Sequence, residues 1–175
     1  LHKFLESFVV GNQFDPTTQM AGLVSELQRD RVNAYLDLVG QDGEKLVFGG
    51  EKTTGKDLLI KQTLIDNVKP GSRLAQEEIF GPVLVAIDAK DEAEALQLAN
   101  GTEYGLAASV WTSNVARAHK FARKLRAGTV WVNTFDMLDV ITPFGGFGAS
   151  GNGRDKSLHA LDAYSALKTT WVDLN

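Results

Sequence analysis

The chain contains no cysteine in its 175 residues. Without a thiol it can form neither a disulfide nor a thiolate metal site, and it carries no cysteine nucleophile. Its three histidines, His2, His119 and His159, do not have the spacing of metal ligands. The sequence therefore predicts no metal site, and we interpret the histidines as surface or capping residues.

A surplus of positive charge and a long apolar run are also lacking. Lysine and arginine number 18 against 22 aspartates and glutamates, so nothing predicts binding to nucleic acid or to an anionic membrane. No apolar run approaches the length that spans a bilayer, and the first residues do not form a signal peptide. We expect a cytoplasmic protein and, because the sequence does not begin with methionine, a fragment, a processed product or part of a longer chain.

The segments that are present alternate between β-rich apolar runs and amphipathic helices. With 43% hydrophobic and 23% charged residues, the composition is that of a globular domain with room for a core. From residue 83 to 133 the order predicts strands at Val83–Ile87, Ala107–Trp111 and Thr129–Val132, and helices beginning at Asp91 and at Ser113 or Asn114. This order indicates an α/β fold of right-handed βαβ units around a parallel sheet.

The first third of the chain predicts one clear helix and several short extended segments. Ser25 followed by Gln28 is a capping-box pattern, which places the start of the helix. One face of this helix is apolar, with Val32, Tyr35, Leu36 and Val39 at helical spacing. The extended segments are Leu46–Phe48, Leu58–Ile60 and Thr63–Ile65.

One stretch, Gln76-Glu77-Glu78-Ile79-Phe80-Gly81-Pro82-Val83, fits neither a helix nor a strand. Pro82 fixes its own φ and moves Gly81 away from the α region, and glycine takes conformations that other residues avoid. Loops anchored to a rigid scaffold are where binding residues concentrate. Spacing alone leaves two interpretations open: Glu78 and Phe80 bind a ligand, or the carboxylates are solvated and Phe80 belongs to the core.

A second irregular stretch, Asn133–Gly153, follows the last strand of the predicted sheet. Loops this long in a compact domain are usually functional or disordered, and parallel sheets bind ligands at the carboxyl ends of their strands. Gly146–Gly151 matches G-x-G-x-x-G, but a dinucleotide fingerprint directly follows a strand and opens a helix, unlike this match. The mixture of aromatic and acidic residues favours a pocket wall.

These stretches together resemble the signatures of the NAD(P)-dependent aldehyde dehydrogenases. The motifs are Gln76–Val83, then Ala127-Gly128-Thr129-Val130-Trp131-Val132-Asn133, then Pro143-Phe144-Gly145-Gly146 followed by Ser150-Gly151, in the family's order and spacing. The resemblance covers nearly the whole chain and corresponds to the C-terminal third or so of a family member. It implies two regions: residues 1–163 as the later part of the catalytic domain, and residues 164–175 as an oligomerisation tail.

By this resemblance Glu78 holds the hydroxyls of the nicotinamide-side ribose of NAD or NADP, and Phe80 packs near the nicotinamide ring. A carboxylate suits a vicinal diol because it accepts hydrogen bonds from both hydroxyls. Asn133 supports the substrate site, and the expected aldehyde pocket is lined by Asp136, Leu138, Thr142 and Phe144. Asp155 stands where the family usually has a glutamate proposed to relay protons, and it is shorter than that residue.

The end of the chain is predicted to mediate self-association. Asp155–Ala163 can form a helix and Lys168–Leu174 a strand, and an unpaired terminal strand invites pairing with another chain. In the family this tail adds to a neighbouring subunit's sheet, which implies a homo-oligomer through residues 168–174. The alternative is a strand folded back on its own domain.

Ser150–Leu161 further resembles the γ-glutamyl-γ-aminobutyraldehyde dehydrogenases of polyamine and putrescine breakdown.

The resemblance implies oxidation of an aldehyde to a carboxylic acid with NAD(P)+. In the family a cysteine thiolate adds to the aldehyde, hydride passes to the cofactor, and water activated by a glutamate releases the acid. Because this chain has no cysteine and the dinucleotide domain lies upstream by the resemblance, we expect it to be inactive alone and to bind no cofactor. The alternative, from a different class, is a non-catalytic, self-associating assembly module.

Overall fold

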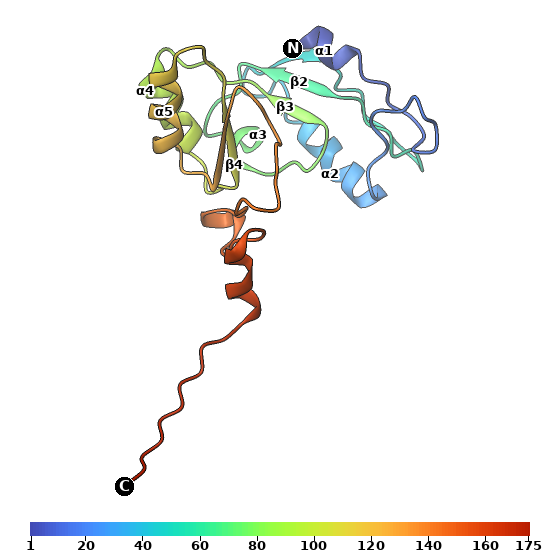
Figure 1. The fold of residues 1–175 in the computed structure, drawn as a ribbon. Helices are drawn as coiled ribbons and strands as arrows, with labels where there is room; N and C mark the ends of the chain where they lie inside the picture. Colours follow the sequence, from blue (N-terminus) through green and yellow to red (C-terminus); the bar gives the residue numbers. More distant parts are fainter. The chain divides into compact units, whose positions relative to one another are not determined.

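The computed structural model describes residues 1–175, which form two compact units, Leu1–Ala89 and Lys90–Asn175 (Figure 1). The first unit contains helices α1 (His2–Glu6), α2 (Glu26–Leu36) and α3 (Arg73–Gln76) and strands β1 (Lys45–Phe48), β2 (Thr63–Asp66) and β3 (Val83–Val85). The second contains helices α4 (Glu92–Asn100) and α5 (Val115–Lys124), strands β4 (Ala107–Val110) and β5 (Thr129–Val132), and two 3-10 helices, Gly148–Ser150 and Leu158–Tyr164.

The first unit is a three-stranded sheet in the order β1-β2-β3. Strand β2 pairs antiparallel with β1 and parallel with β3. Helix α2 starts as predicted, since the Ser25 hydroxyl accepts a hydrogen bond from the Gln28 amide, 3.2 Å away. Its apolar face packs on the sheet: Val32 and Tyr35 share the buried core with Ile65 of β2 and with Ile79.

The second unit is built on one parallel βαβ unit, β4–α5–β5, in which all four residue pairs from Ala107–Thr129 to Val110–Val132 are in register. Asn114 caps α5 by accepting a hydrogen bond from the Arg117 amide. Helices α4 and α5 lie side by side in Figure 1 and are joined at one end by Glu92, which accepts hydrogen bonds from Arg117 and Lys120.

The predicted α/β class with parallel strands is confirmed, with three corrections. Strand β3 is shorter than Val83–Ile87, and its central residue Leu84 is 45% accessible. It also pairs with β2 and not with β4, so β3–α4–β4 does not close a second βαβ unit. Sequence alternation identifies strands but not their partners. Val39, placed on the helical face, lies beyond the end of α2, which stops at Leu36.

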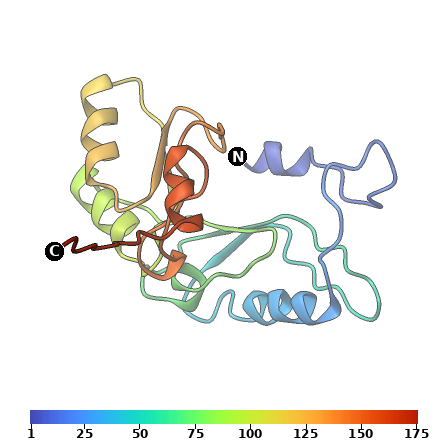
Figure 2. The ribbon, with the colours of Figure 1, turned by 60° about the horizontal axis from the view of Figure 1, so that its bottom comes forward.

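The C-terminal region departs most from prediction. The helix expected from Asp155 begins only at Leu158 and is a 3-10 helix, because Lys156 and Ser157 have left-handed φ values of 60° and 52°. The strand expected at Lys168–Leu174 does not form; residues 165–175 have no helix or strand and run out as a single extended segment, also seen in Figure 2. A strand needs a partner edge, and no strand of the two sheets pairs with this segment.

Candidate cofactor and substrate site

The loop between α3 and β3 alternates its side chains between the core and solvent. Ile79 is 8% exposed and belongs to the buried core, whereas Phe80 is 67% exposed. Glu78, on the other side of Ile79, is exposed as well. The two exposed side chains therefore flank a core residue, and both the carboxylate of Glu78 and the ring of Phe80 face solvent. The interpretation of Phe80 as a core residue is therefore wrong.

Helix α2 holds the backbone of this loop through two polar side chains. The Gln28 side-chain amide donates hydrogen bonds to the carbonyl oxygens of both Ile79 (3.0 Å) and Phe80 (2.8 Å). The Arg31 guanidinium donates to the carbonyl oxygen of Glu78 at 2.8 Å. Gln28 thus does not complete the capping box predicted from its spacing to Ser25. Its side chain binds the backbone of Ile79 and Phe80 instead.

The glycine of the loop is needed for close approach and not for an unusual φ. A Cβ on Gly81 would lie 2.6 Å from Cγ2 of Val32, a fully buried residue of α2. The left-handed residue of this loop is not the glycine but Phe80, with φ of 58°. A non-glycine residue at positive φ is strained, and such strain concentrates at functional sites where surrounding contacts over-determine it.

The two adjacent glutamates have different surroundings. Both carboxylate oxygens of Glu77 accept hydrogen bonds from Arg73, at 2.8 and 2.9 Å, and one of them also accepts from the Tyr35 hydroxyl at 2.8 Å. The Arg73 guanidinium, then the Tyr35 hydroxyl, lower the pKa of the Glu77 carboxyl to about 2. No hydrogen bond or ion pair engages the Glu78 carboxylate. Both glutamates are exposed, but the Glu77 carboxylate is engaged by Arg73 and Tyr35, so Glu78 is the one whose carboxylate is open to a ligand.

The predicted substrate-side residues lie in the second unit, on the loop that follows β5. Asn133, with φ of 54°, uses its side chain to bind the backbone of Thr112: its amide donates to the carbonyl oxygen (2.8 Å) and its oxygen accepts from the amide (2.7 Å). Asn133 therefore fixes the turn between β4 and α5. Asp136 (φ 55°), Leu138 and Thr142 are exposed, and the Trp131 indole holds the loop between them by donating to the Met137 carbonyl oxygen.

Phe144 and Asp155 are the pair that the structure brings together. Their backbones exchange two hydrogen bonds, of 2.9 and 2.7 Å. Both line a cavity of about 280 Å³ whose other walls include Leu106, Ser150, Asn152 and Arg154. Asp136, Leu138 and Thr142 do not line it. The structure therefore groups Phe144 with the proposed relay residue and separates it from the remaining predicted pocket residues.

The glycines of the second loop serve packing. A Cβ on Gly146 would meet Cβ of Ser150 at 2.6 Å, and one on Gly145 would meet the Gly153 carbonyl oxygen at 2.4 Å. Gly148–Ser150 is a single 3-10 turn and opens no α-helix. The match to G-x-G-x-x-G therefore lacks the helix that a dinucleotide fingerprint opens, and its glycines are required by close contacts.

Sequence reasoning missed the residues that hold the first loop. Arg73 stands four residues before Glu77, a spacing typical of a helical ion pair, so this contact could have been found. The partners on α2, namely Gln28, Arg31 and Tyr35, lie 42 to 52 residues from the groups they bind, and no local pattern points to them.

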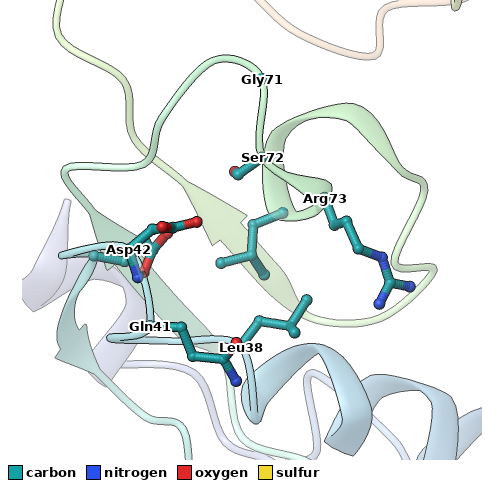
Figure 3. Close-up of a pocket in the computed structure, with 8 residues that line it drawn as sticks. Leu38, Gln41, Asp42, Gly71, Ser72 and Arg73 are labelled. Atoms are coloured by element: carbon teal, nitrogen blue, oxygen red, sulfur yellow. Dashed lines mark hydrogen bonds between the residues drawn. The ribbon is translucent and has the colours of Figure 1, made fainter.

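The first unit also contains a cavity of about 300 Å³ between the end of α2 and the start of α3 (Figure 3). It is lined by Leu38, Gln41, Asp42, Glu44, Gly71, Ser72, Arg73 and Leu74. In Figure 3 the Arg73 side chain points away from Asp42.

No cluster of three or more histidine, aspartate or glutamate side chains is arranged to bind a metal ion, and none of the helices is both long and apolar enough to cross a bilayer.

Comparison with known proteins identifies the class to which this geometry belongs. The family model described as the Aldehyde dehydrogenase family matches residues 1–170. The chain therefore belongs to the aldehyde dehydrogenase family.

Its relatives include Betaine aldehyde dehydrogenase 1 of Rhizobium meliloti (42% identical, 97% of this chain and 35% of the relative). The NADP/NAD-dependent aldehyde dehydrogenase PuuC of Escherichia coli is 44% identical over 94% of this chain and 33% of its own length. A solved indole-3-acetaldehyde dehydrogenase in complex with NAD+ superposes with a TM-score of 0.92 at 47% identity, over 99% of this chain and 35% of that one. The chain thus spans about a third of the proteins it matches.

Proposed function

We propose that this chain supplies the nicotinamide-facing and aldehyde-facing loops of an NAD(P)+-dependent aldehyde dehydrogenase. The observation that carries the proposal is the asymmetry of the two glutamates: Glu77 is occupied by Arg73 and Tyr35, while the exposed Glu78 carboxylate has no partner. An acceptor-only carboxylate fits the two hydroxyls of a ribose, and the exposed ring of Phe80 fits an apolar aromatic face.

In this proposal Glu78 orients the cofactor ribose and Phe80 the nicotinamide ring, which when bound accepts hydride from the substrate. Phe144 shapes the aldehyde pocket from the second loop, with Asp136, Leu138 and Thr142 as further wall residues and Asn133 as their support. Asp155, beside Phe144, would relay a proton. These residues contribute orientation, which accounts for a large share of an enzyme's rate. The thiol nucleophile would come from outside these 175 residues, since the chain has no cysteine.

A chimaeric enzyme tests this assignment. The matching third of the Rhizobium meliloti betaine aldehyde dehydrogenase, which aligns with 172 residues of this chain, is replaced by the present sequence. We expect NAD(P)+-dependent oxidation of aldehydes by the chimaera and none by the isolated chain.

Glu78→Gln in the chimaera is expected to raise KM for the cofactor roughly tenfold, because a charged acceptor is lost. Asp88→Asn, at another exposed carboxylate, is the control. Equal KM values in both variants would contradict the role of Glu78.

For the substrate, we propose an aminoaldehyde, with γ-glutamyl-γ-aminobutyraldehyde as the first candidate. The support is the resemblance of Ser150–Leu161 to that subgroup together with the 44% identity to PuuC. The chimaera is expected to gain kcat/KM for γ-glutamyl-γ-aminobutyraldehyde relative to the betaine aldehyde enzyme from which it was made. An unchanged ratio between the two aldehydes would remove this substrate assignment.

A second candidate function, self-association through residues 168–174, is favoured by the exposure of the tail. Leu167, Trp171 and Leu174 are all more than nine-tenths exposed. Apolar side chains on an unpaired extended segment favour pairing with another chain. Light scattering is expected to show an oligomer of the intact chain and a smaller species after truncation at Lys168, and a monodisperse monomer would contradict this candidate.

A further inference from the structure

Glu77, which the cofactor assignment does not use, joins three separate elements. Its carboxylate accepts from Arg73 of α3 and from Tyr35 of α2, while its own backbone leads into the loop that carries Glu78 and Phe80. The Arg73 guanidinium also lies over the Tyr35 ring, 5.3 Å from its centroid. The three side chains therefore form a closed ring of contacts, which we term the Glu77 clamp (Tyr35, Arg73 and Glu77).

The clamp connects the loop to the core of the unit. Tyr35 is only 5% exposed and packs among the core side chains, so its hydroxyl is a fixed point. Arg73 is exposed, and it lines the cavity of Figure 3 together with Asp42 and Glu44. Its guanidinium nevertheless pairs with Glu77. A planar guanidinium paired in a fork with a carboxylate fixes orientation as well as distance.

The clamp acts on the first residue of the loop, and α2 acts on the next three. Arg31 and Gln28 hold the carbonyl oxygens of Glu78, Ile79 and Phe80, whereas Glu77 is held through its side chain. Residue 77 is therefore the point at which the direction of the loop is set as the chain leaves α3. A shift there would rotate Glu78, whose side chain has no contact of its own to correct it.

We propose that Glu77 is a positioning residue of the cofactor site, which acts through the Glu77 clamp to fix the direction in which Glu78 and Phe80 are presented. This inference rests on the proposed function of Glu78. It assigns the two neighbouring carboxylates separate roles: one holds the loop and the other faces the ligand.

Hydrogen–deuterium exchange of the intact 175-residue chain tests the clamp without any cofactor. In Glu77→Gln and in Arg73→Met, the amide of residue 77, which donates to the carbonyl oxygen of residue 73 at 3.0 Å, is expected to exchange about two- to fivefold faster. This range corresponds to an exposed ion pair. Glu78→Gln removes a neighbouring charge without touching the clamp and is expected to leave exchange unchanged. Circular dichroism of each variant verifies the fold. Unchanged exchange in a folded Glu77→Gln chain would overturn the clamp.

Kinetics of the chimaera then test the positioning role. Glu77→Gln is expected to raise KM for the cofactor about two- to fivefold with little change in kcat. Arg73→Met is expected to raise this KM as well, and Arg73→Lys to raise it less than Arg73→Met does. If Glu78→Gln has no effect on the cofactor KM, the proposed function fails while the exchange result still decides the clamp. If Glu78→Gln raises KM but Glu77→Gln does not, the positioning role is refuted and the proposed function stands.

Discussion

Replacing Gly81 by alanine perturbs the point at which the loop between α3 and β3 meets α2. The new methyl group would lie 2.6 Å from one methyl carbon of Val32 and 3.3 Å from the other. Val32 is fully buried and β-branched, so neither its position nor its rotamer adjusts freely. Overpacking of this kind costs about 1–3 kcal/mol, and because φ of Gly81 is not left-handed, backbone strain does not contribute to the cost.

The assay is urea unfolding of the chain followed by far-UV circular dichroism, with Gly71→Ala as the matched control. No atom comes within 4 Å of a Cβ at Gly71, so its replacement is expected to be neutral or to stabilise by up to about 1 kcal/mol. Adding Val32→Ala to Gly81→Ala should relieve the clash, giving a favourable coupling of at least about 1 kcal/mol in a double-mutant cycle. Equal unfolding midpoints for Gly81→Ala and Gly71→Ala, or an additive cycle, would refute the close contact.

Three further predictions concern charge, turn geometry and the exposed site residues. Glu77 has a folded-state pKa of about 2, below the ordinary 4.5, so its contribution to stability should be complete above about pH 4.5 and disappear as the pH falls through 2. The difference in urea unfolding midpoint between the chain and Glu77→Gln, measured against pH, should follow this course. A difference that grows on acidification would contradict it. Asn133→Ala should destabilise by about 1–2 kcal/mol, because two hydrogen bonds to Thr112 are lost, and an unchanged unfolding midpoint would count against this. Glu78→Gln and Phe80→Leu should each change stability by less than about 0.5 kcal/mol, because both side chains face solvent; a larger loss would show that they stabilise the fold.

Local signals in the sequence placed the elements well. Residue type and spacing predict the cap at Ser25, a helix start at Asp91 and a cap at Ser113 or Asn114. In the structure Ser25, Asp91 and Asn114 each accept a hydrogen bond from a backbone amide three residues on. Such contacts join residues three apart, so the sequence contains both partners within one turn. The strands at Lys45–Phe48 and Thr129–Val132 were likewise evident from β-branched and aromatic residues.

Contacts between distant residues could not be predicted in this way. The partner of β3 is β2, although the alternation of elements pointed to β4. Tyr35 belongs to the predicted apolar face of α2. Nothing within that helix indicates that its hydroxyl donates a hydrogen bond to Glu77, 42 residues away. Gln28 satisfied a local pattern but has a non-local partner. Where one side chain can meet either a local or a distant group, packing of the whole unit decides between them.

The contacts of α2 hold the strained residue of the loop, Phe80, in place. Gly81, the next residue, passes against Val32 where a Cβ would not fit. The Gln28 amide stabilises the left-handed turn at Phe80 by donating to the carbonyl oxygens of Ile79 and Phe80, which lie on either side of the Phe80 Cα. All these contacts lie within the first unit, so the loop takes its shape without a ligand. A loop already ordered in this way loses little conformational entropy on binding, so under the proposed function its order favours affinity for the cofactor at Glu78 and Phe80.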